Sequence, residues 1–400
     1  MRGSSDHDVH RGVPSSTSAI SMTIESLVDA RALAVHASGI GARLATVDAA
    51  VRHLGVIQLD SITVAGRAHA MTLSTRLTEH SGSEVDRDLW NSERPMVFEA
   101  PIHAASLAAI DTWPNWGFRR DAIRDQHLDW APSDSMRRDI LHRLDTEGPL
   151  TMKALRGAQA PGSGWSWGPV KEALEHMVWT GDVVCVRRTN WNRVFDLPER
   201  AIPADLLRAE LSPGDGLKRV VRDALTCLGI GTTQDVADYL RLREAQVEQV
   251  LLDLEFERVQ LPSVEGSLWV SPLAGAEPTI AASPVLVNPF DNLVWHRPRL
   301  KWLFNIDYRF EAYKPPANRT YGYYTLLLLA NNAIRGRADV KTNKGVLQVN
   351  DVWFERQPAE AEMTVAVGDL ARRLSTTETI VSERLGQIHP RLAQQIVSSA

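Results

Sequence analysis

Two long stretches of the chain place apolar residues at helical spacing and then change to the two-residue period of strands. In residues 131–203 the spacing predicts a helix, a turn at Gly148 and Pro149, and a second helix that begins at the capping residue Thr151. A third helix follows, and two strands around a polar turn come after it. The third helix has one apolar face, made of Val170, Ala173, Leu174, Met177 and Val178. Three helices and a hairpin are the elements of a winged helix.

The same order of elements returns in residues 204–278, after a proline-rich boundary at Pro203–Pro213. GLKRVVRDALTCLGI, TTQDVADYL and REAQVEQVLLDLE each have the apolar spacing of a helix, the second capped by Thr232 or Thr233. VQLPSVEGSLWVSP then predicts a hairpin. Two copies in tandem indicate duplication of one DNA-binding unit, although winged helices also mediate protein contacts and do not by themselves decide the partner.

Residues 23–130 are a rougher copy of this pattern. A helix capped near Thr23, a second helix over Thr46–Leu54 and a strand over Val56–Asp60 give the order helix, helix, strand. ITVAGRAHAMTLSTRL, which follows the strand, fits either a helix or an irregular segment. FEAPIHAASL is expected to be helical, and this unit is therefore interpreted as a third winged helix.

The last part of the chain, residues 279–400, changes to alternating and β-branched positions. Turns are expected at Asn331-Asn332 and Lys344-Gly345, which predicts an antiparallel sheet or a small barrel. The C-terminal VGDLARRLSTTETIVSERLGQIHPRLAQQIVSSA predicts one or two surface helices, and residues 1–22 are interpreted as a disordered extension. The expected fold class is α+β, with three tandem winged-helix domains and a C-terminal β-rich part.

Composition narrows the class of protein. The 400 residues are 44% hydrophobic and 23% charged, which is typical of a soluble globular chain. Cys185 and Cys227 are too few for a disulfide framework or a cysteine-rich zinc site, and this favours a reducing cytoplasm. The chain has no apolar run near the roughly 18 residues of a membrane span and no signal peptide, so no membrane partner is expected. A net charge of −5 means that any binding to nucleic acid depends on local basic patches.

The best candidate for chemistry is VIQLDSITVAGRAH, residues 56–69. In an extended strand successive side chains alternate faces, so Gln58 and Asp60 should point the same way while Ile57 and Leu59 anchor the other side. One face would then be core and the other a site. On the motif alone, the favoured interpretation is structural: a half-buried strand whose acid pairs with Arg67.

Four further polar residues could support this strand. Arg67 and His69 follow it closely and could position Asp60 or contact DNA. Glu99 and His103 stand four residues apart, which on a helix would bring them together. A solvent-exposed pair is the more ordinary interpretation of that spacing.

Two sets of basic residues could contact DNA phosphates. The hairpin of residues 184–196 carries a basic and aromatic set, with the aromatic at its tip, and this combination suits either groove contact or solubility equally. Its members are Arg187, Arg188, Trp191 and Arg193. The β-rich part carries the second set, which is made of Arg319, Arg335, Arg337, Lys341 and Lys344.

Several separated motifs resemble the AlkZ-like family, also called YcaQ-like, of winged-helix DNA glycosylases that includes enzymes able to unhook interstrand crosslinks. They are VIQLDSITVAGRAH, FE…HAASL, RVFDLPER, NPFDNLVWHRPRLKWLFNIDYRFEAY, and RTYGYYTLLLL with RGRADVK, spread over residues 23–356. The resemblance implies three tandem winged helices and a catalytic signature of glutamine, an apolar residue and an acid or amide, here Gln58, Leu59 and Asp60. Ala100 and Pro101 stand where many relatives carry two aromatics.

The resemblance therefore reverses the order of the interpretations and makes Gln58 and Asp60 the expected catalytic pair. The implied function is a monofunctional glycosylase that excises N-alkylated purines and unhooks crosslinks, acting as a monomer on alkylated or crosslinked double-stranded DNA in the cytoplasm, at the nucleoid. No metal, cofactor or lyase activity is expected. A winged-helix transcription regulator is the alternative, which an Asp60 buried against Arg67 would favour, and a protein-interaction scaffold is a third, weaker interpretation.

Overall fold

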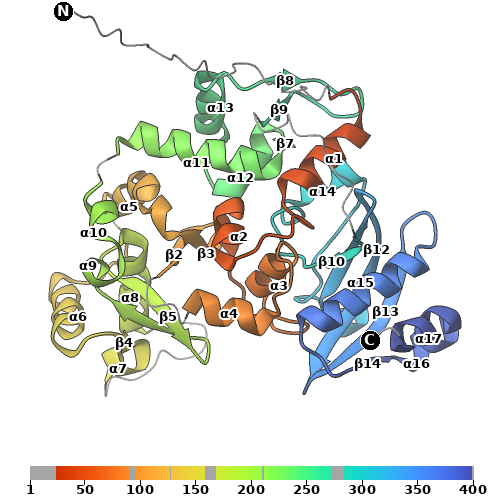
Figure 1. The fold of residues 1–400 in the computed structure, drawn as a ribbon. Helices are drawn as coiled ribbons and strands as arrows, with labels where there is room; N and C mark the ends of the chain where they lie inside the picture. Colours follow the sequence, from red (N-terminus) through yellow and green to blue (C-terminus); the bar gives the residue numbers. More distant parts are fainter. Residues whose placement is uncertain are drawn as a thin grey trace, which may run out of the picture.

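The computed structural model describes residues 24–90, 95–126, 128–157, 168–209, 211–271 and 283–398, and the segment interpreted as an extension, residues 1–22, lies outside this part. The described helices and strands form three similar units and a larger C-terminal unit. In Figure 1 the first unit lies in the centre, with the second at the lower left, the third above and the C-terminal unit on the right. The mixed α and β architecture confirms the expected class.

The first three units share one order of elements: helix, strand, helix, helix, strand, strand. The first unit, residues 47–109, contains α2 (Val47–Leu54), β1 (Val56–Gln58), α3 (Ala68–Ser74), α4 (Gly82–Trp90), β2 (Val97–Ile102) and β3 (Ala104–Ala109). The second, residues 134–196, contains α6 (Asp134–Glu147), β4 (Leu150–Thr151), α7 (Met152–Arg156), α8 (Pro169–Thr180), β5 (Val184–Thr189) and β6 (Asn192–Asp196). The third, residues 213–270, contains α11 (Pro213–Leu228), β7 (Ile230–Gly231), α12 (Thr233–Leu240), α13 (Glu244–Asp253), β8 (Arg258–Val259) and β9 (Leu268–Val270).

The three small sheets also share one topology. Their strand orders are β1-β3-β2, β4-β6-β5 and β7-β9-β8, so in each unit the strand after the first helix pairs with the last strand. The expected helix caps are confirmed, because the hydroxyls of Thr151 and Thr232 accept the backbone N–H three residues on. The predicted apolar face of the third helix in the second unit is buried.

Shorter elements connect the units. The helix α1 (Leu27–Ala37) is capped by Ser26 and packs against α11 and the C-terminal unit. A 3₁₀ segment, η1 (Ile110–Trp116), and α5 (Gly117–Arg124) lead from the first unit to the second, and α9 (Pro198–Ala201) and α10 (Ala204–Arg208) lead from the second to the third. The first and third units share one continuous apolar core, whereas the second unit has its own.

The expectation of a helix over FEAPIHAASL is wrong, because these residues form the hairpin of β2 and β3. Pro101 explains the difference: it lacks the N–H that a helix interior needs and its ring collides with the preceding turn. A proline is tolerated at the edge of a sheet, and β2 is an edge strand. Ala104 makes the tight turn with a φ of 57°.

The C-terminal unit, residues 285–398, is an open five-stranded sheet and not a barrel. Its strand order is β10-β11-β12-β13-β14, with only β13 and β14 parallel. The strands are β10 (Val285–Val287), β11 (Thr325–Ala330), β12 (Ala333–Asn343), β13 (Val346–Phe354) and β14 (Glu378–Val381). The turns predicted at Asn331-Asn332 and Lys344-Gly345 are present, and all four residues have positive φ.

Helices cover this sheet. The helices are α14 (Arg297–Phe304), the 3₁₀ segment η2 (Pro316–Asn318), α15 (Glu360–Arg373), α16 (Glu383–Ile388) and α17 (Pro390–Ser398). Figure 1 shows α15 lying across the sheet, where its buried Met363, Val367 and Leu370 contact the strands. The prediction of only helices after residue 367 missed the strand β14. Among the helices in the described ranges, none has the length and apolar character of a membrane span.

Candidate active site

A groove of about 1960 Å³ lies where the first three units meet. Its walls come from the segment after β1, the β2–β3 hairpin and α5, one face of α8, the turn between β5 and β6, and the turn between α12 and α13. Because these elements are distant in sequence, the groove exists only in the assembled fold. It is the feature around which the candidate chemistry is arranged.

Gln58 and Asp60 both line this groove. The strand β1 pairs antiparallel with β3, with Gln58 opposite Ser106, and the N–H of Leu59 continues the ladder to the carbonyl of Ala105 at 2.8 Å. Ile57 and Leu59 are buried, whereas the two polar side chains are only half-buried. Gln58 and Asp60 therefore both reach the groove, as predicted, and Ile57 lies in the core, whereas Leu59 is buried but also lines the groove.

The carboxylate of Asp60 has an unusual environment. Its Oδ1 accepts the backbone N–H of Ile62 at 2.7 Å, and among the described residues it forms no ion pair. Burial raises the pKa of Asp60, and the hydrogen bond from Ile62 opposes this rise. The group is thus a partly desolvated carboxylate without a counter-ion, which is an arrangement found where a charge is used for chemistry.

Arg67 and His69 are engaged elsewhere. The guanidinium carbon of Arg67 lies 3.7 Å from the ring centre of Trp191, and His69 stacks on the same indole at 5.4 Å. His69 is fully buried and its Nε2 lies 2.6 Å from Asp86. The predicted pairing of Arg67 with Asp60 does not form within the described part of the chain, and His69 cannot contact DNA from its buried position.

Glu99 holds two arginines of the second unit. Its carboxylate accepts hydrogen bonds from Arg188, at 2.7 Å from Nε and 2.8 Å from Nη2, and Arg193 lies 3.9 Å away. Arg193 is also ion-paired with Glu175. Trp191 lies between Arg67 and Arg188, whose guanidinium carbon is 4.2 Å from the ring centre. Arg188 and Arg193, which were predicted to contact DNA, therefore tie the β5–β6 hairpin to the first unit and form part of the groove wall.

His103 connects the first unit to the third in a similar way. Its Nδ1 lies 2.9 Å from the carbonyl oxygen of Asp238, and its Nε2 lies 3.2 Å from Nη2 of Arg241. The imidazole is stacked on Trp295, with ring centres 3.9 Å apart. Burial is the main cause that lowers the pKa of His103 to about 4, and the positive charge of Arg241 is the second cause. The ring is therefore neutral at neutral pH. The expected contact between Glu99 and His103 is replaced by these two separate contacts to other units.

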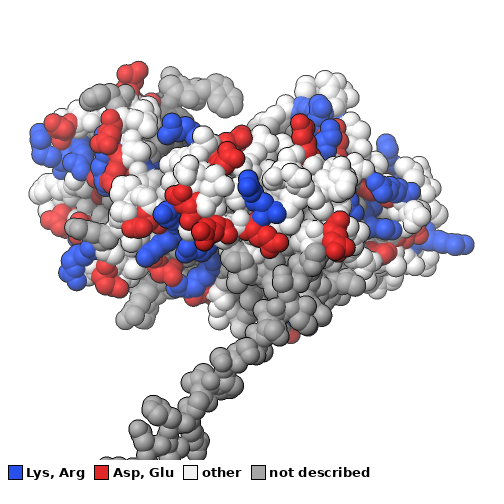
Figure 2. Space-filling model, turned by 90° about the horizontal axis from the view of Figure 1, so that it is seen from above, with Lys and Arg blue, Asp and Glu red and all other residues white. Residues whose placement is uncertain are grey.

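The groove is basic although the chain is acidic. Its lining contains seven basic residues and three acidic ones among the described residues. The basic residues are Arg119, Lys153, Lys171, Arg188, Arg193, Arg241 and Arg243, and the acidic ones are Asp60, Glu99 and Glu175. On the face drawn in Figure 2, by contrast, basic and acidic side chains are interspersed. Five of these cations, all except Arg188 and Arg193, carried no local sequence signal.

The second set of predicted DNA contacts is only partly exposed. Lys341 and Lys344 are exposed on β12 and at its turn, and Arg187 is exposed on β5. Arg319 and Arg335 are half-buried. Arg337 is 3% exposed and donates to Glu355 at 2.7 Å, so the expectation that it faces DNA is wrong. The loop preceding β11 covers this position, since Arg337 also donates to the carbonyl of Asp307.

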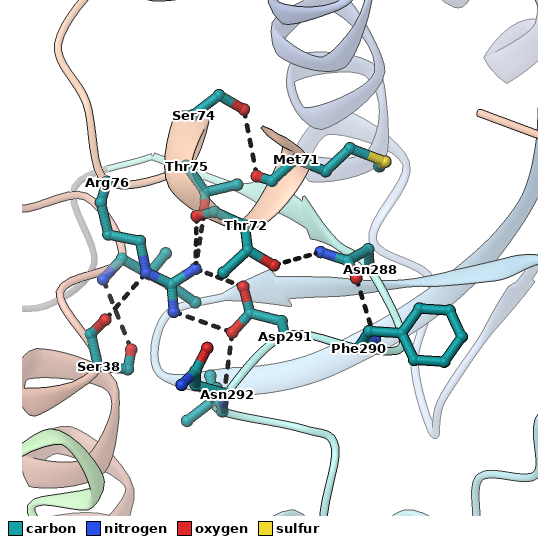
Figure 3. A network of polar contacts seen from close by, with 12 residues as sticks. Ser38, Met71, Thr72, Ser74, Thr75, Arg76, Asn288, Phe290, Asp291 and Asn292 are labelled. Atoms are coloured by element: carbon teal, nitrogen blue, oxygen red, sulfur yellow. Dashed lines mark hydrogen bonds and ion pairs between the residues drawn. The ribbon is translucent and has the colours of Figure 1, made fainter. Parts of the chain in front are cut away.

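A buried polar network connects the C-terminal unit to α3 and β1 (Figure 3). Arg76 and Asp291 are both fully buried and form a bidentate ion pair, with Nη2 to Oδ1 at 2.9 Å. Asn288 donates to the hydroxyl of Thr72 at 2.8 Å. Asn292 donates to the carbonyl of Val56, at the start of β1, at 2.7 Å. The NPFDNLVW motif thus fixes β1 and α3 in place.

The fold resembles that of a solved DNA glycosylase. The chain is similar to Streptomyces sahachiroi DNA glycosylase AlkZ, with a TM-score of 0.60 and 15% sequence identity over 90% of this chain and 100% of that chain. Residues 51–373 match the family of AlkZ-like DNA glycosylases, and the chain belongs to this family. The matched range contains both Gln58 and Asp60. The resemblance inferred from separated motifs is therefore confirmed.

Proposed function

We propose that the protein is a monofunctional DNA glycosylase that releases N-alkylated purines from double-stranded DNA and whose groove also admits crosslinked bases. The observation that carries this proposal is the carboxylate of Asp60, which has no counter-ion among the described residues and lies beside Gln58 on a basic groove. Duplex DNA is an extended polyanion, and a groove rich in arginine and lysine is suited to its phosphates.

Release of an N7-alkylated purine requires one carboxylate placed near the sugar and no general acid. Alkylation at N7 makes a purine cationic, so the base leaves as a neutral molecule when the bond to C1′ breaks, and no general acid is needed. Positive charge develops on the deoxyribose as the bond lengthens. Asp60 stabilises this oxocarbenium-like state, and partial desolvation strengthens the attraction.

Water completes the reaction. An oxygen of water forms the new bond to C1′, and the released proton passes to Asp60 or to solvent. The Gln58 amide, two residues before Asp60 on the same side of the strand, offers one donor group and one acceptor group to orient the water. Because water is the nucleophile, the abasic sugar remains in an unbroken strand, which is monofunctional activity.

The architecture supports recognition of a duplex with bulky lesions. The repeated order of elements and the shared sheet topology support three tandem winged helices, with boundaries at residues 23–130, 131–203 and 204–278. The groove of about 1960 Å³ is larger than the roughly 300–1,000 Å³ of ordinary ligand pockets. A crosslinked base cannot be flipped into a tight pocket, whereas an open groove can receive it.

The transcription-regulator alternative needs a buried Asp60 paired with Arg67. Asp60 instead lines the groove, and Arg67 lies over Trp191. No observation in the described structure favours that alternative over the glycosylase.

The test is base release from a duplex that carries one N7-methylguanine, compared between wild type and Asp60→Asn. Wild type should release the base, and the variant should be slower by about 10²–10³-fold while it binds the duplex equally well. Equal rates in both would remove the proposed mechanism. A parallel reaction with a nitrogen-mustard crosslink tests whether the groove admits the larger lesion.

A further inference from the structure

The turn between α12 and α13 is locked onto the first unit at the edge of the groove. The N–H of His103 Nδ1 donates to the carbonyl of Asp238, and Arg119 donates to the carbonyls of Pro101, at 2.7 Å, and Leu240. The last carbonyls of a helix lack partners within the helix and must find them elsewhere. Here one donor, His103, comes from the first unit and the other, Arg119, comes from α5, so the third unit cannot shift at this point without losing them.

The geometry of His103 fixes its tautomer. A carbonyl oxygen only accepts hydrogen bonds, so the proton of the neutral imidazole is on Nδ1. Nε2 is therefore an acceptor, and Nη2 of Arg241 lies 3.2 Å from it. Nη1 of Arg241 donates to Asp238 at 2.6 Å. The guanidinium is thus held by two contacts to His103 and Asp238.

Arg241 nevertheless remains open to the groove. Its side chain is 54% exposed and is part of the groove lining. A guanidinium has five N–H donors, and the two contacts described use two of them. Three donors are left for a ligand in the groove. Arg243, two residues further on, is exposed on the same groove and forms no ion pair within the described ranges.

The backbone of Arg241 also has an unfavourable conformation. It is the C-terminal cap of α12, in the left-handed conformation with φ 50° and ψ 48°, where glycine is the usual residue. A residue with a Cβ is strained in this conformation, because the Cβ lies too close to the following carbonyl oxygen. The strain is tolerated at a position where a fixed guanidinium faces the groove.

We propose that Arg241, oriented by His103, and Arg243 form a phosphate-binding site of the third unit that holds the DNA backbone while the first unit performs the chemistry. The inference rests on the proposed function, because it assigns duplex DNA to the groove. His103 is a positioning residue, since it acts through Arg241 and lies outside the groove lining. The ligand is a backbone phosphodiester, so the contact is independent of the base sequence.

Salt-dependent binding of an undamaged, fluorescently labelled duplex tests this site. Arg241→Gly relieves the backbone strain and removes the guanidinium, and Arg243→Gln removes the second charge. Arg43→Gly is a matched control, because Arg43 is also exposed, has a φ of 54° and lies outside the groove lining.

Each groove variant should lower the slope of log affinity against log salt by about 0.9, the loss expected for one phosphate contact, and lower affinity about 5- to 10-fold at low salt. The control should keep the wild-type slope. If wild type binds the duplex but the groove variants keep its slope, the site is wrong while the proposed function stands. If wild type itself does not bind, the proposed function fails with it.

A second measurement separates positioning from general loss of fold. His103→Phe keeps a ring on Trp295 and removes both nitrogens. His103→Phe should lower duplex affinity about 3- to 10-fold in the wild-type background. It should have no further effect in the Arg241→Gly background. Equal losses in both backgrounds would show that His103 does not act through Arg241.

Discussion

The carboxylate of Glu99 and the guanidinium of Arg188 form a bidentate pair that joins the first unit to the second, with donor distances of 2.7 and 2.8 Å. The two side chains are 5% and 11% exposed, so both charges are largely removed from water. Glu99→Gln leaves Arg188 buried with a neutral partner and should lower the free energy of unfolding by about 3 kcal/mol. Urea unfolding measures this change.

The control for this prediction is Glu147→Gln, which breaks the exposed pair with Arg143. Its midpoint of unfolding should match that of wild type, because exposed pairs contribute little. Equal midpoints for the two variants would contradict the role assigned to Glu99.

Asp60→Asn should stabilise the protein at neutral pH. Burial raises the pKa of Asp60, so the folded state holds its proton more tightly than the unfolded chain does. Stability from such a group is present at low pH and is lost as the pH rises through the raised pKa. The asparagine has no charge to desolvate and can still accept the N–H of Ile62.

The variant should therefore melt about 1–4 °C above wild type at pH 7, and the gap should close as the pH falls through the range in which Asp60 becomes protonated. Thermal melts across pH measure it. A variant less stable than wild type at pH 7 would show that Asp60 has a stabilising partner in solution.

The rate of base release should depend on the charge of Asp60. Activity is expected to fall in acid with an apparent pKa above that of an ordinary aspartate, because burial raises the pKa. Gln58→Glu places a second carboxylate two residues away on the same strand face. Like charges raise each other's pKa, so this variant should move the acidic limb of the rate profile to higher pH. If the acidic limb of the profile stays at the same pH, the side chain at position 58 does not interact with Asp60.

Asp291→Asn should weaken the packing of the C-terminal unit against the first unit and lower the free energy of unfolding. It removes the counter-charge of the fully buried Arg76 and should cost about 3–5 kcal/mol. Asp307→Asn is the control, since Asp307 is 74% exposed beside Arg309. Chemical denaturation of both variants compares them, and comparable midpoints would mean that the buried pair does not hold the units together.

Much of the local structure could be predicted from the sequence because the signals are local. The caps Thr151 and Thr232, and the turn at Asn331-Asn332, each depend on a few adjacent residues. The orientation of Gln58 and Asp60 followed from the two-residue period of a strand, and the fold confirms it.

The partners of the site residues could not be predicted in this way, because they are distant in the chain. Glu99 and Arg188 are 89 residues apart, and His103 and Arg241 are 138 apart. Glu99 and His103 stand four residues apart in a segment that was expected to be helical, but Pro101 disfavours a helix there and β2 pairs with β3. The parallel strand β14 was missed for a similar reason, since its pairing with β13 depends on α15 folding between them.

The hydrogen bond from Asn292 to Val56 has a consequence for the order of events during synthesis. The two residues are 236 positions apart, so the carbonyl at the start of β1 waits for its partner until well over half of the chain has left the ribosome. Contacts this distant form late in folding. A nascent chain that ends before Asn292 would therefore carry β1 without this hydrogen bond, and the placement of Gln58 and Asp60 would be completed only after that part of the chain is made.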